Sequence, residues 1–153
     1  MAGFHFRLQT LVRLRESVRD ERRSQLADAL RVDATLEEQE KQLQTDLDAT
    51  RQGQRAPAGR VDVDRILQSQ RYEVILQSEL AGITQQRQHV AQEIETRRQA
   101  LMEADRDVKV LEKLKETQLT RWRDDQQRRE QSELDEAAVM GHYRREMAEG
   151  GTP

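Results

Sequence analysis

The chain has 153 residues, of which 36% are Asp, Glu, Lys or Arg, 35% are hydrophobic and 3% are aromatic. An average globular domain has about 25% charged and about 45–50% apolar residues, so this chain has too few apolar side chains to fill a compact core. The charges are mixed in sign and the net charge is only -3, which argues against disorder. The composition excludes an ordinary globular enzyme and favours long helices with many surface ion pairs, in a single domain over residues 1–153.

Cysteine is absent, which excludes disulfides and thiolate chemistry. No apolar run approaches the roughly 18 residues that a membrane span needs. The apolar residues near the N-terminus are interrupted by Arg7, Gln9 and Arg13, unlike those of a signal peptide. We therefore expect a soluble, intracellular chain.

Glycine and proline divide the sequence into two long helical segments, because both residues are rare outside a short stretch near residue 56. The expected elements are a first helix over about 4–52, a turn over 53–60, a second helix over about 61–147 and a frayed C-terminus over 148–153. The expected fold is all-α: an antiparallel coiled-coil hairpin whose second helix is longer than the first.

Several residues are expected to set the ends of these helices. Pro57 bars helix continuation, and Gly53 and Gly59 on either side of it can adopt positive φ in a turn. The second helix has two candidate N-caps, Asp62 and Asp64. A second break is expected at Gly141.

The second helix carries a heptad repeat, which is typical of a coiled coil. Ten of the 14 seam positions are apolar, over six heptads. These positions are Leu76, Leu80, Ile83, Arg87, Val90, Ile94, Arg97, Leu101, Ala104, Val108, Leu111, Lys115, Gln118 and Trp122. The first helix is less regular, and one frame in it reads Phe4, Leu8, Leu11, Arg15, Val18, Arg22, Gln25, Ala29, Val32 and Leu36, with Leu14, Leu26, Leu30 and Leu47 off the frame.

An antiparallel hairpin pairs residues whose numbers sum to a constant, and 112 fits the two frames. The midpoint, residue 56, falls inside the expected turn. The apolar pairs are Leu36 with Leu76, Val32 with Leu80, Ala29 with Ile83, Val18 with Ile94, Leu11 with Leu101, Leu8 with Ala104 and Phe4 with Val108. Three pairs fit poorly: Gln25 with Arg87, Arg22 with Val90 and Arg15 with Arg97. They indicate a looser zone or a register that is one turn off.

In this register the second helix has no partner from about Lys109 to Met147, on the order of 55 Å of single helix. The segment carries Val110, Leu111, Leu114, Leu119, Trp122 and Leu134. A lone helix of that length is marginal in water unless its apolar side is covered, so we predict a partner protein. Fraying in solution is the alternative.

The sequence has no recognisable catalytic, cofactor or metal motif. The three histidines, His5, His89 and His142, lack ligand spacing, and His89 with Glu93 is expected to be a helix-face pair. The carboxylate pairs Asp105 with Asp107 and Asp124 with Asp125 lie on expected exposed helix, without a pocket to separate their pKa values. A glycine-rich phosphate loop is also missing. We therefore expect no enzyme activity and no cofactor.

Charge is distributed unevenly along the expected hairpin. Residues 4–23 carry six basic and three acidic side chains, and residues 106–130 carry eight and six, so this end is positive. Residues 28–48 carry two basic and seven acidic side chains, and residues 61–105 carry five and eight. Such a dipole could orient the chain between two partners of different charge. Nucleic-acid binding is disfavoured because acids are interleaved and stacking aromatics are scarce.

Three segments resemble the FliJ family of flagellar export proteins, and the start of the second helix, Tyr72-x-x-Ile75-Leu76, is similar as well. The segments are Phe6-Arg7-Leu8-Gln9-Thr10-Leu11-Val12-Arg13-Leu14-Arg15, Val110-Leu111-Glu112-Lys113-Leu114-Lys115-Glu116 and Glu133-Leu134-Asp135-Glu136-Ala137-Ala138. The resemblance covers nearly the whole chain, including its length and the longer second helix.

The resemblance implies a non-catalytic component of the flagellar type III export apparatus, similar to the coiled-coil stalk of the rotary ATPase γ subunit. Its implied partners are the hexameric export ATPase, the cytoplasmic domain of the membrane export gate and export chaperones that it escorts. The implied location is the cytoplasm, peripheral to the inner face of the cell membrane at the flagellar basal body. We expect a monomer on its own, without nucleic-acid binding or membrane insertion.

Two sets of residues are candidates for these contacts. We expect the ATPase to bind the open end, at Phe4, Phe6, Leu8, Leu11, Leu111, Leu114, Leu119 and Trp122. The resemblance places the gate surface toward the turn, at Gln39, Leu43, Tyr72 and Ile75. The sequence departs from relatives that have aromatic residues nearby on the first helix, because Asp46 and Thr50 stand there. Ordinary seam packing is the alternative role for all these residues.

Two other functions remain open on the sequence alone. One is a homodimerising coiled-coil scaffold, or a stalk protein of an injectisome rather than of a flagellum. The other is a hairpin that binds nucleic acid or acts like the chaperone prefoldin.

Overall fold

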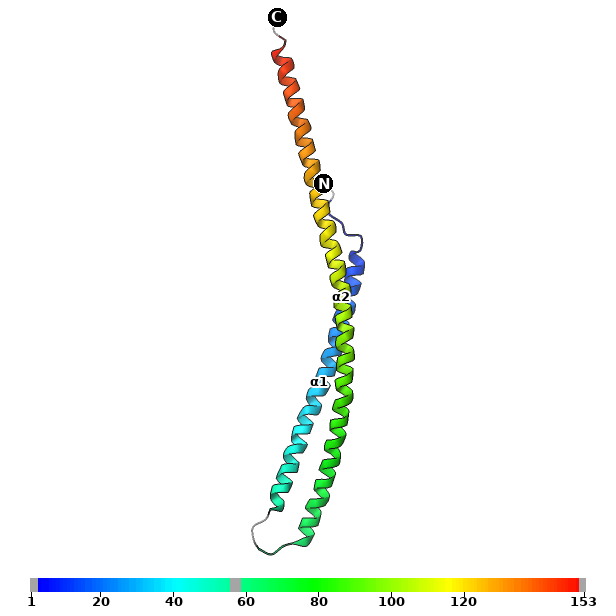
Figure 1. Cartoon of the computed structure of the whole chain (residues 1–153), viewed down its shortest axis with the longest axis vertical. Coiled ribbons are helices and arrows are strands. Elements are labelled where there is room, and N and C mark those ends of the chain that lie inside the picture. Colours follow the sequence, from blue (N-terminus) through cyan, green and yellow to red (C-terminus); the bar gives the residue numbers. More distant parts are fainter. Residues whose placement is uncertain (1–2, 56–58, 152–153) are drawn as a thin grey trace. The chain divides into compact units, whose positions relative to one another are not determined.

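The computed structural model describes residues 3–55 and 59–151. These residues form two helices, α1 (Gln9–Gln54) and α2 (Val63–Glu149), of 46 and 87 residues, with no strand among them. Hydrogen bonds between the helices join early residues of one to late residues of the other, so the helices pack antiparallel (Figure 1). The predicted all-α hairpin with a longer second helix is confirmed.

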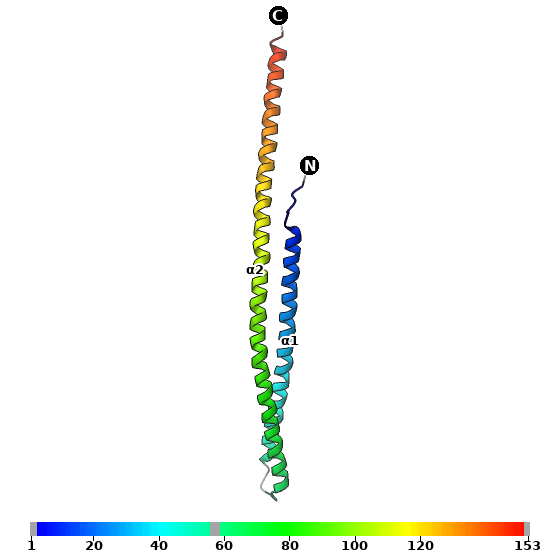
Figure 2. The same cartoon turned by 90° about the vertical axis from the view of Figure 1, so that its right-hand side faces the viewer.

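The contacts divide the chain into two units, which we describe separately. The terminal unit comprises residues 1–15 and 106–153, and the loop unit comprises residues 16–105. In both views of the loop unit, the end of α1 and the start of α2 lie at the connecting loop (Figures 1 and 2). That the whole chain forms one domain stays a prediction.

The first helix begins later than its apolar pattern predicts. Residues 4–8 are not helical, and α1 starts where the Gln9 amide donates to the Phe6 carbonyl at 3.1 Å and the Val12 amide donates to the Leu8 carbonyl at 2.9 Å. The side chains that precede Gln9 include two phenylalanines and no hydroxyl or carboxylate that could cap the helix. The N-terminal segment therefore joins the fold through its aromatic rings instead.

The turn begins after Gln54 rather than at Gly53, and Gly53 and Gly59 do not adopt the positive φ that was predicted for them. α1 continues through Gly53 to Gln54, and no glycine among the described residues has a positive φ. A single glycine lowers helix propensity by only about 1 kcal/mol relative to alanine, which the preceding helical turns overcome. Pro57 lies outside the described residues.

Asp62 caps the second helix, as one of the two alternatives predicted. Its Oδ1 accepts hydrogen bonds from the backbone amides of Asp64 at 3.1 Å and Arg65 at 3.4 Å. Its carbonyl accepts the first helical bond, from the Ile66 amide at 3.2 Å. Asp64 is the second residue of α2 and does not cap it.

The predicted break at Gly141 is wrong. α2 runs through Gly141 to Glu149, and the Gly150 amide donates to the Glu146 carbonyl at 2.8 Å at its end. Ala137, Ala138 and Met140 precede the glycine and favour helix strongly, and no proline follows until the C-terminus. Glycine without proline is a weak breaker.

The predicted seam of α2 is confirmed by burial. Leu76, Ala104 and Val108 are buried, and every predicted position from Leu76 to Lys115 is buried or half-buried. The frame then shifts by one residue, because Gln118 is exposed and Leu119 is half-buried in its place.

The predicted frame of α1 is wrong in part. Ala29 and Leu36 lie on the seam as predicted, but Val32 is 50% exposed and Asp33 is half-buried beside it. Seam positions that fell outside the predicted frame include Val12, Glu16, Arg19, Leu26, Glu40, Leu43 and Leu47. Polar residues take several of these positions because their aliphatic stems can cover apolar surface while their heads reach water.

The predicted pairing constant of 112 is also wrong. Hydrogen-bonded partners across the two helices have residue numbers that sum to between 120 and 127, and Gln54 with Ser69 gives 123. At 123, buried Leu47 lies opposite buried Leu76. The predicted and observed alignments differ by roughly three helical turns, so the same helix faces stay together. Periodicity identifies the faces but leaves their axial alignment open.

The N-cap of α2 can be tested by substitution. We expect Asp62→Ala to lower the free energy of unfolding by about 1 kcal/mol, because the amides of Asp64 and Arg65 lose their acceptor. Urea unfolding followed by circular dichroism measures the change. Asp64→Ala is the matched control, and an equal loss in both variants would contradict the assignment of the cap.

Candidate partner-binding surfaces

In the terminal unit, the segment before α1 packs against α2 through aromatic rings. The Phe4 and Trp122 rings lie with their centroids 6.1 Å apart and their planes tilted by 55°. This separation and tilt fall within the range favoured by aromatic pairs. Phe6 is buried, with only 4% of its surface exposed. The predicted ATPase-contact residues Phe4, Phe6 and Trp122 therefore pack within the chain.

The other predicted ATPase-contact residues divide into two groups. Leu11, Leu111 and Leu119 are half-buried and belong to the seam. Leu8 and Leu114 are each 38% exposed and offer apolar surface to a partner. Two further apolar residues of this unit are more exposed still, Leu14 at 59% and Val110 at 67%. Leu14 lies off the predicted frame, but so do Leu26 and Leu47, which belong to the seam, so off-frame position alone does not identify an exposed leucine.

Polar contacts join the two helices on either side of these leucines. The Lys115 ammonium donates to the Gln9 side-chain oxygen at 3.0 Å, and Arg15 Nη1 lies 3.3 Å from Asp107 Oδ2. Pairing with the N-terminal segment thus extends along α2 to Trp122. The prediction that α2 lacks a partner from Lys109 onward is wrong, because it followed from the incorrect register.

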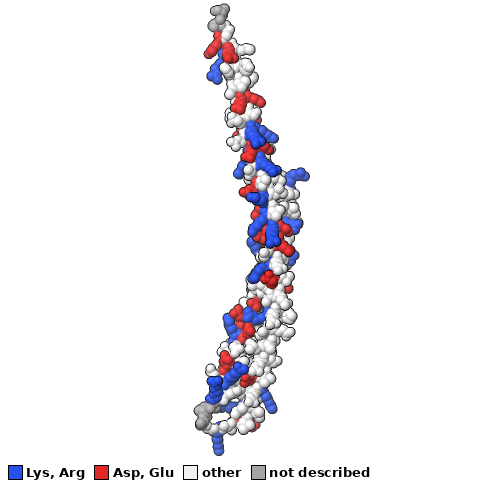
Figure 3. All heavy atoms as spheres, viewed as in Figure 1, with Lys and Arg blue, Asp and Glu red and all other residues white. Residues whose placement is uncertain are grey.

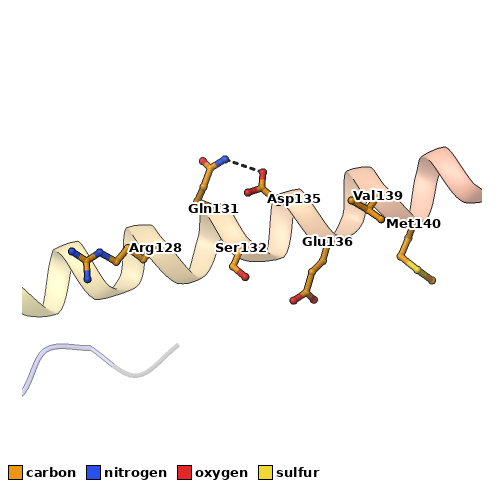
Figure 4. Close-up of a pocket in the computed structure, with 7 residues that line it drawn as sticks. All are labelled: Arg128, Gln131, Ser132, Asp135, Glu136, Val139 and Met140. Carbon is orange, nitrogen blue, oxygen red and sulfur yellow. Dashed lines mark hydrogen bonds between the residues drawn. The ribbon is translucent and has the colours of Figure 1, made fainter.

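Beyond Trp122, α2 continues as a single helix, and residues 127–140 are exposed without exception. Figure 4 shows the surface between Arg128 and Met140, where Gln131 donates to Asp135 at 3.0 Å. All residues that line this shallow pocket come from α2, so no second element among the described residues faces it.

This single helix carries apolar residues that nothing in the described chain covers. Val139, Tyr143 and Met147 follow one another at steps of four and are 53%, 60% and 82% exposed. Such spacing places side chains on one helix face. The sequence shows this spacing, but the expected break at Gly141 concealed it.

In the loop unit, the predicted gate residues do not form one surface. Gln39 and Leu43 line a shallow groove together with Gly82 and Ile83 of α2. Tyr72 lines a different groove, next to the loop, with Thr50, Gln54 and Ile66 among its other walls. Ile75 is 53% exposed and lines neither groove. The pairing constant of 112 would have placed Gln39 beside residue 73, whereas 123 places it beside residue 84.

Asp46 and Thr50, where relatives are expected to have aromatic residues, are both half-buried. The Thr50 hydroxyl donates to the Asp46 carbonyl at 2.8 Å, and the Asp46 carboxylate accepts from Gln42 at 3.0 Å. Their side chains are engaged along α1 itself. Tyr72, 48% exposed, is consequently the aromatic residue that this part of the chain offers to a partner.

A polar cluster fixes the end of α1 against α2 near the loop. Arg51 Nε donates to Glu73 Oε1 at 2.8 Å, and Gln54 donates to both Ser69 at 3.1 Å and Glu73 at 3.2 Å. The hydrogen bonds from Arg51 and then Gln54 hold the pKa of Glu73 below its usual value, outweighing the opposite effect of burial.

Charge is distributed differently over the two helices of the loop unit. In α1, nine of the positions from 31 to 51 are charged, whereas three are charged in the equally long stretch of α2 from 66 to 86. In Figure 3 the charged spheres of this unit gather over α1, and the side formed by α2 is mostly white. The start of α2 thus presents a weakly charged surface, with exposed Arg71 within it, that includes Leu67, Val74 and Ile75, each exposed by 46% or more.

No group of three or more potential metal-binding side chains occurs in the part of the chain that the structure describes. No helix there combines the length and apolar character of a membrane span. Glu93 binds Arg97 at 2.7 Å, in place of the pair expected with His89.

Comparison with known proteins identifies a family over most of the chain. A family model described as "Flagellar FliJ protein" matches residues 4–147. The match includes both helices almost completely, the N-terminal aromatic segment and the single-helix part of α2. Comparisons with curated proteins and with solved structures give no significant match.

The aromatic contact in the terminal unit has a convenient reporter, because Trp122 is the chain's one tryptophan. We expect Phe4→Ala to shift the emission of Trp122 to longer wavelength, since the indole loses the ring that shields it from water at 6.1 Å. The loss of the aromatic pair should also cost about 1 kcal/mol in the free energy of unfolding. His5→Ala, at an exposed neighbouring position, is the control. Unchanged emission in Phe4→Ala would contradict this packing.

The Glu73 cluster predicts a pH dependence. A carboxyl whose pKa is lowered in the folded state stabilises the fold above its ordinary value near 4.5, and that stabilisation is lost as the pH falls through the lowered pKa. We therefore expect the difference in unfolding free energy between the wild type and Glu73→Gln to be largest above pH 5 and to shrink on acidification. Urea unfolding at a series of pH values measures it, with exposed Glu38→Gln as control. A difference that does not change with pH would contradict the assignment.

Proposed function

Since the chain belongs to the flagellar FliJ protein family, we propose that this component of the flagellar export apparatus works as a stalk between the export ATPase and the membrane export gate. The family is one of non-catalytic coiled-coil export proteins. In this proposal the ATPase ring binds the terminal unit, and the cytoplasmic domain of the gate binds the loop unit.

The single observation that carries the proposal is the change from two helices to one in the terminal unit. Up to Trp122 the helix is accompanied by the N-terminal segment, and from residue 127 to residue 140 it is fully exposed. The stripe of Val139, Tyr143 and Met147 lacks a partner among the described residues. A single helix with exposed apolar side chains is marginal in water, and a protein ring with a central opening could enclose it.

Two exposed leucines extend the proposed ATPase surface to the two-helix part. Leu8 and Leu114 retain 38% exposure each although neighbouring seam residues are covered. The basic residues of this part support the same assignment, because Arg7, Arg13 and Lys113 surround the leucines in sequence and can steer an acidic partner. The aromatic residues Phe4, Phe6 and Trp122 then act indirectly, by holding the N-terminal segment against α2.

For the gate, the proposed surface is the weakly charged start of α2 rather than the groove between the helices. Tyr72 and Ile75 are about half exposed, and few charges interrupt this part of α2. Aromatic and aliphatic residues in such surroundings are typical of the centres of protein interfaces. Gln39 and Leu43 would contribute a separate, smaller contact.

The remaining parts of the proposal are supported by the family alone. They are the escort of empty export chaperones and a location at the cytoplasmic face of the membrane, next to the flagellar basal body.

One reciprocal binding experiment tests the division between the two units. The variant Leu8→Ala with Leu114→Ala should weaken binding to the export ATPase by about tenfold or more, because each removes apolar contact from an interface. Binding to the cytoplasmic domain of the gate should be unchanged. The variant Tyr72→Ala with Ile75→Ala should show the opposite pattern. Isothermal titration with each purified partner provides the affinities.

Val74→Ala, at a position 64% exposed, controls for the loss of an exposed aliphatic side chain when ATPase binding is measured. Circular dichroism confirms that every variant keeps its helices. The proposal fails if neither partner binds the wild-type chain. The division between units fails if both double variants weaken both partners equally.

A further inference from the structure

The apolar residues of the loop unit permit two axial alignments of the helices. In the observed one, residue numbers sum to about 123 and Leu47, Leu43 and Ala29 lie opposite Leu76, Leu80 and Ile94. In an alignment with a sum of 112, Leu36, Val32, Ala29 and Val18 would lie opposite Leu76, Leu80, Ile83 and Ile94. The second alignment has one more apolar pair, four against three. Hydrophobic contact therefore does not select the observed alignment.

The two alignments use overlapping faces of α1, although the alternative would cover Val32, which is 50% exposed in the observed one. Sliding from one to the other moves α1 along α2 by roughly three turns, at about 3.6 residues per turn, so the slide turns neither helix appreciably. Along the axis the slide measures roughly 16 Å. A coiled coil with such a pattern needs another interaction to fix its register, and polar seam residues are the best-known device.

Arg87 is the charged residue in the middle of the seam whose contacts exist only in the observed alignment, as do those of the Arg51 and Gln54 cluster near the loop. Its Nε donates to Asp33 Oδ1 at 3.1 Å, its Nη2 donates to Asp33 Oδ2 at 3.4 Å and its Nη1 donates to Glu40 Oε2 at 2.6 Å. Asp33 and Glu40 are one heptad apart on α1, so the guanidinium lies between two carboxylates on one face. The Thr84 hydroxyl also donates to Glu40, at 3.4 Å.

The three charged side chains are half-buried. Arg87, Asp33 and Glu40 expose 30%, 27% and 30% of their side-chain surfaces. Together the two carboxylates raise the pKa of Arg87 above its usual range, Asp33 more strongly than Glu40. Removing one partner from such a pair leaves a poorly hydrated charge, which is much more costly than the loss of an exposed ion pair.

In the alternative alignment all three interactions would be lost. Arg87 would lie opposite Gln25, Asp33 opposite Glu79 and Glu40 opposite Tyr72. Asp33 would then face a like charge, and Arg87 would have no carboxylate opposite it. The free energy gained from one additional apolar pair is small compared with that lost when three charged side chains lose their ionic partners.

We propose that Asp33, Glu40 and Arg87 form a register lock, which holds the hairpin in one of two apolar alignments that differ by three helical turns. Opening the lock makes the second alignment accessible, so a slide of α1 along α2 is a movement built into the loop unit.

Cysteine pairs can report the alignment, because the natural chain contains no cysteine. Ala29→Cys with Ile94→Cys should form a disulfide in the observed alignment, and Ala29→Cys with Ile83→Cys should form one in the alternative. In the otherwise natural chain, mild oxidation should link the first pair at least about tenfold more than the second. In the variant Asp33→Asn, Glu40→Gln and Arg87→Gln, which removes the charges without adding apolar contact to the observed alignment, the second pair should link to a comparable extent. Electrophoresis under non-reducing conditions measures both yields.

A charge-reversed variant, Asp33→Arg with Glu40→Arg and Arg87→Glu, is the matched control. It should restore preference for the first pair, because position 87 again meets two opposite charges in the observed alignment, whereas the alternative forms one opposite-charge pair, between position 33 and Glu79. Arg87→Gln alone, which removes the central charge, provides a second opening variant if the triple variant loses helicity by circular dichroism. The proposal is overturned if a fully helical opening variant still links the first pair alone, or if the natural chain links both pairs equally.

Discussion

The chain is held together by one line of packing between α1 and α2, and this line is thin. Seven hydrophobic residues are buried among those described, and three of them, Phe6, Leu47 and Leu76, have large side chains. No charged or polar residue is buried there. The stems of arginine, lysine and glutamine complete the seam while their heads bind one another across it, as Lys115 and Gln9 do. A seam of this kind requires few apolar residues and tolerates a chain with 36% charged residues.

The same thin seam determines how far the sequence predicts the structure. In α2 the heptad positions are mostly apolar, so burial follows the predicted frame from Leu76 to Lys115. In α1 charged residues occupy seam positions such as Glu16, Arg19 and Asp33, and a frame chosen for apolar content avoids them. It selects Val32 instead, which is 50% exposed. Hydrophobic periodicity thus predicts a helix face only where the packing partners are themselves hydrophobic.

Hydrophobic periodicity does not determine the axial alignment, that is, which residues of the two helices lie opposite each other. Helix ends and cross-helix polar contacts fix it, and neither is visible when apolar residues alone are matched. The error of three turns had two consequences for the candidate sites. It assigned α2 too long an unpaired segment, starting at Lys109 rather than beyond Trp122. It also made Gln39 and Leu43, which the resemblance suggests, seem to lie near Tyr72 at the start of α2, whereas they line a groove with Gly82 and Ile83. Phe4 and Trp122, which the sequence places at the same end, do meet, and the role of this end in binding the ATPase stays a prediction.

Once the alignment is known, the surfaces available to partners are the helix faces that the seam does not use. A helix pair needs about one face of each helix, and the seam uses that face for packing. Several apolar residues keep more than a third of their surface exposed: Leu8, Val110 and Leu114 in the terminal unit, Tyr72 and Ile75 in the loop unit. The exposure of these side chains to water is unfavourable. The many charged residues around them keep the chain soluble despite it. Beyond Trp122 no residue of the seam covers α2, so all faces of the remaining helix are available. A partner that surrounds this helix gains more apolar contact than one that binds a single side.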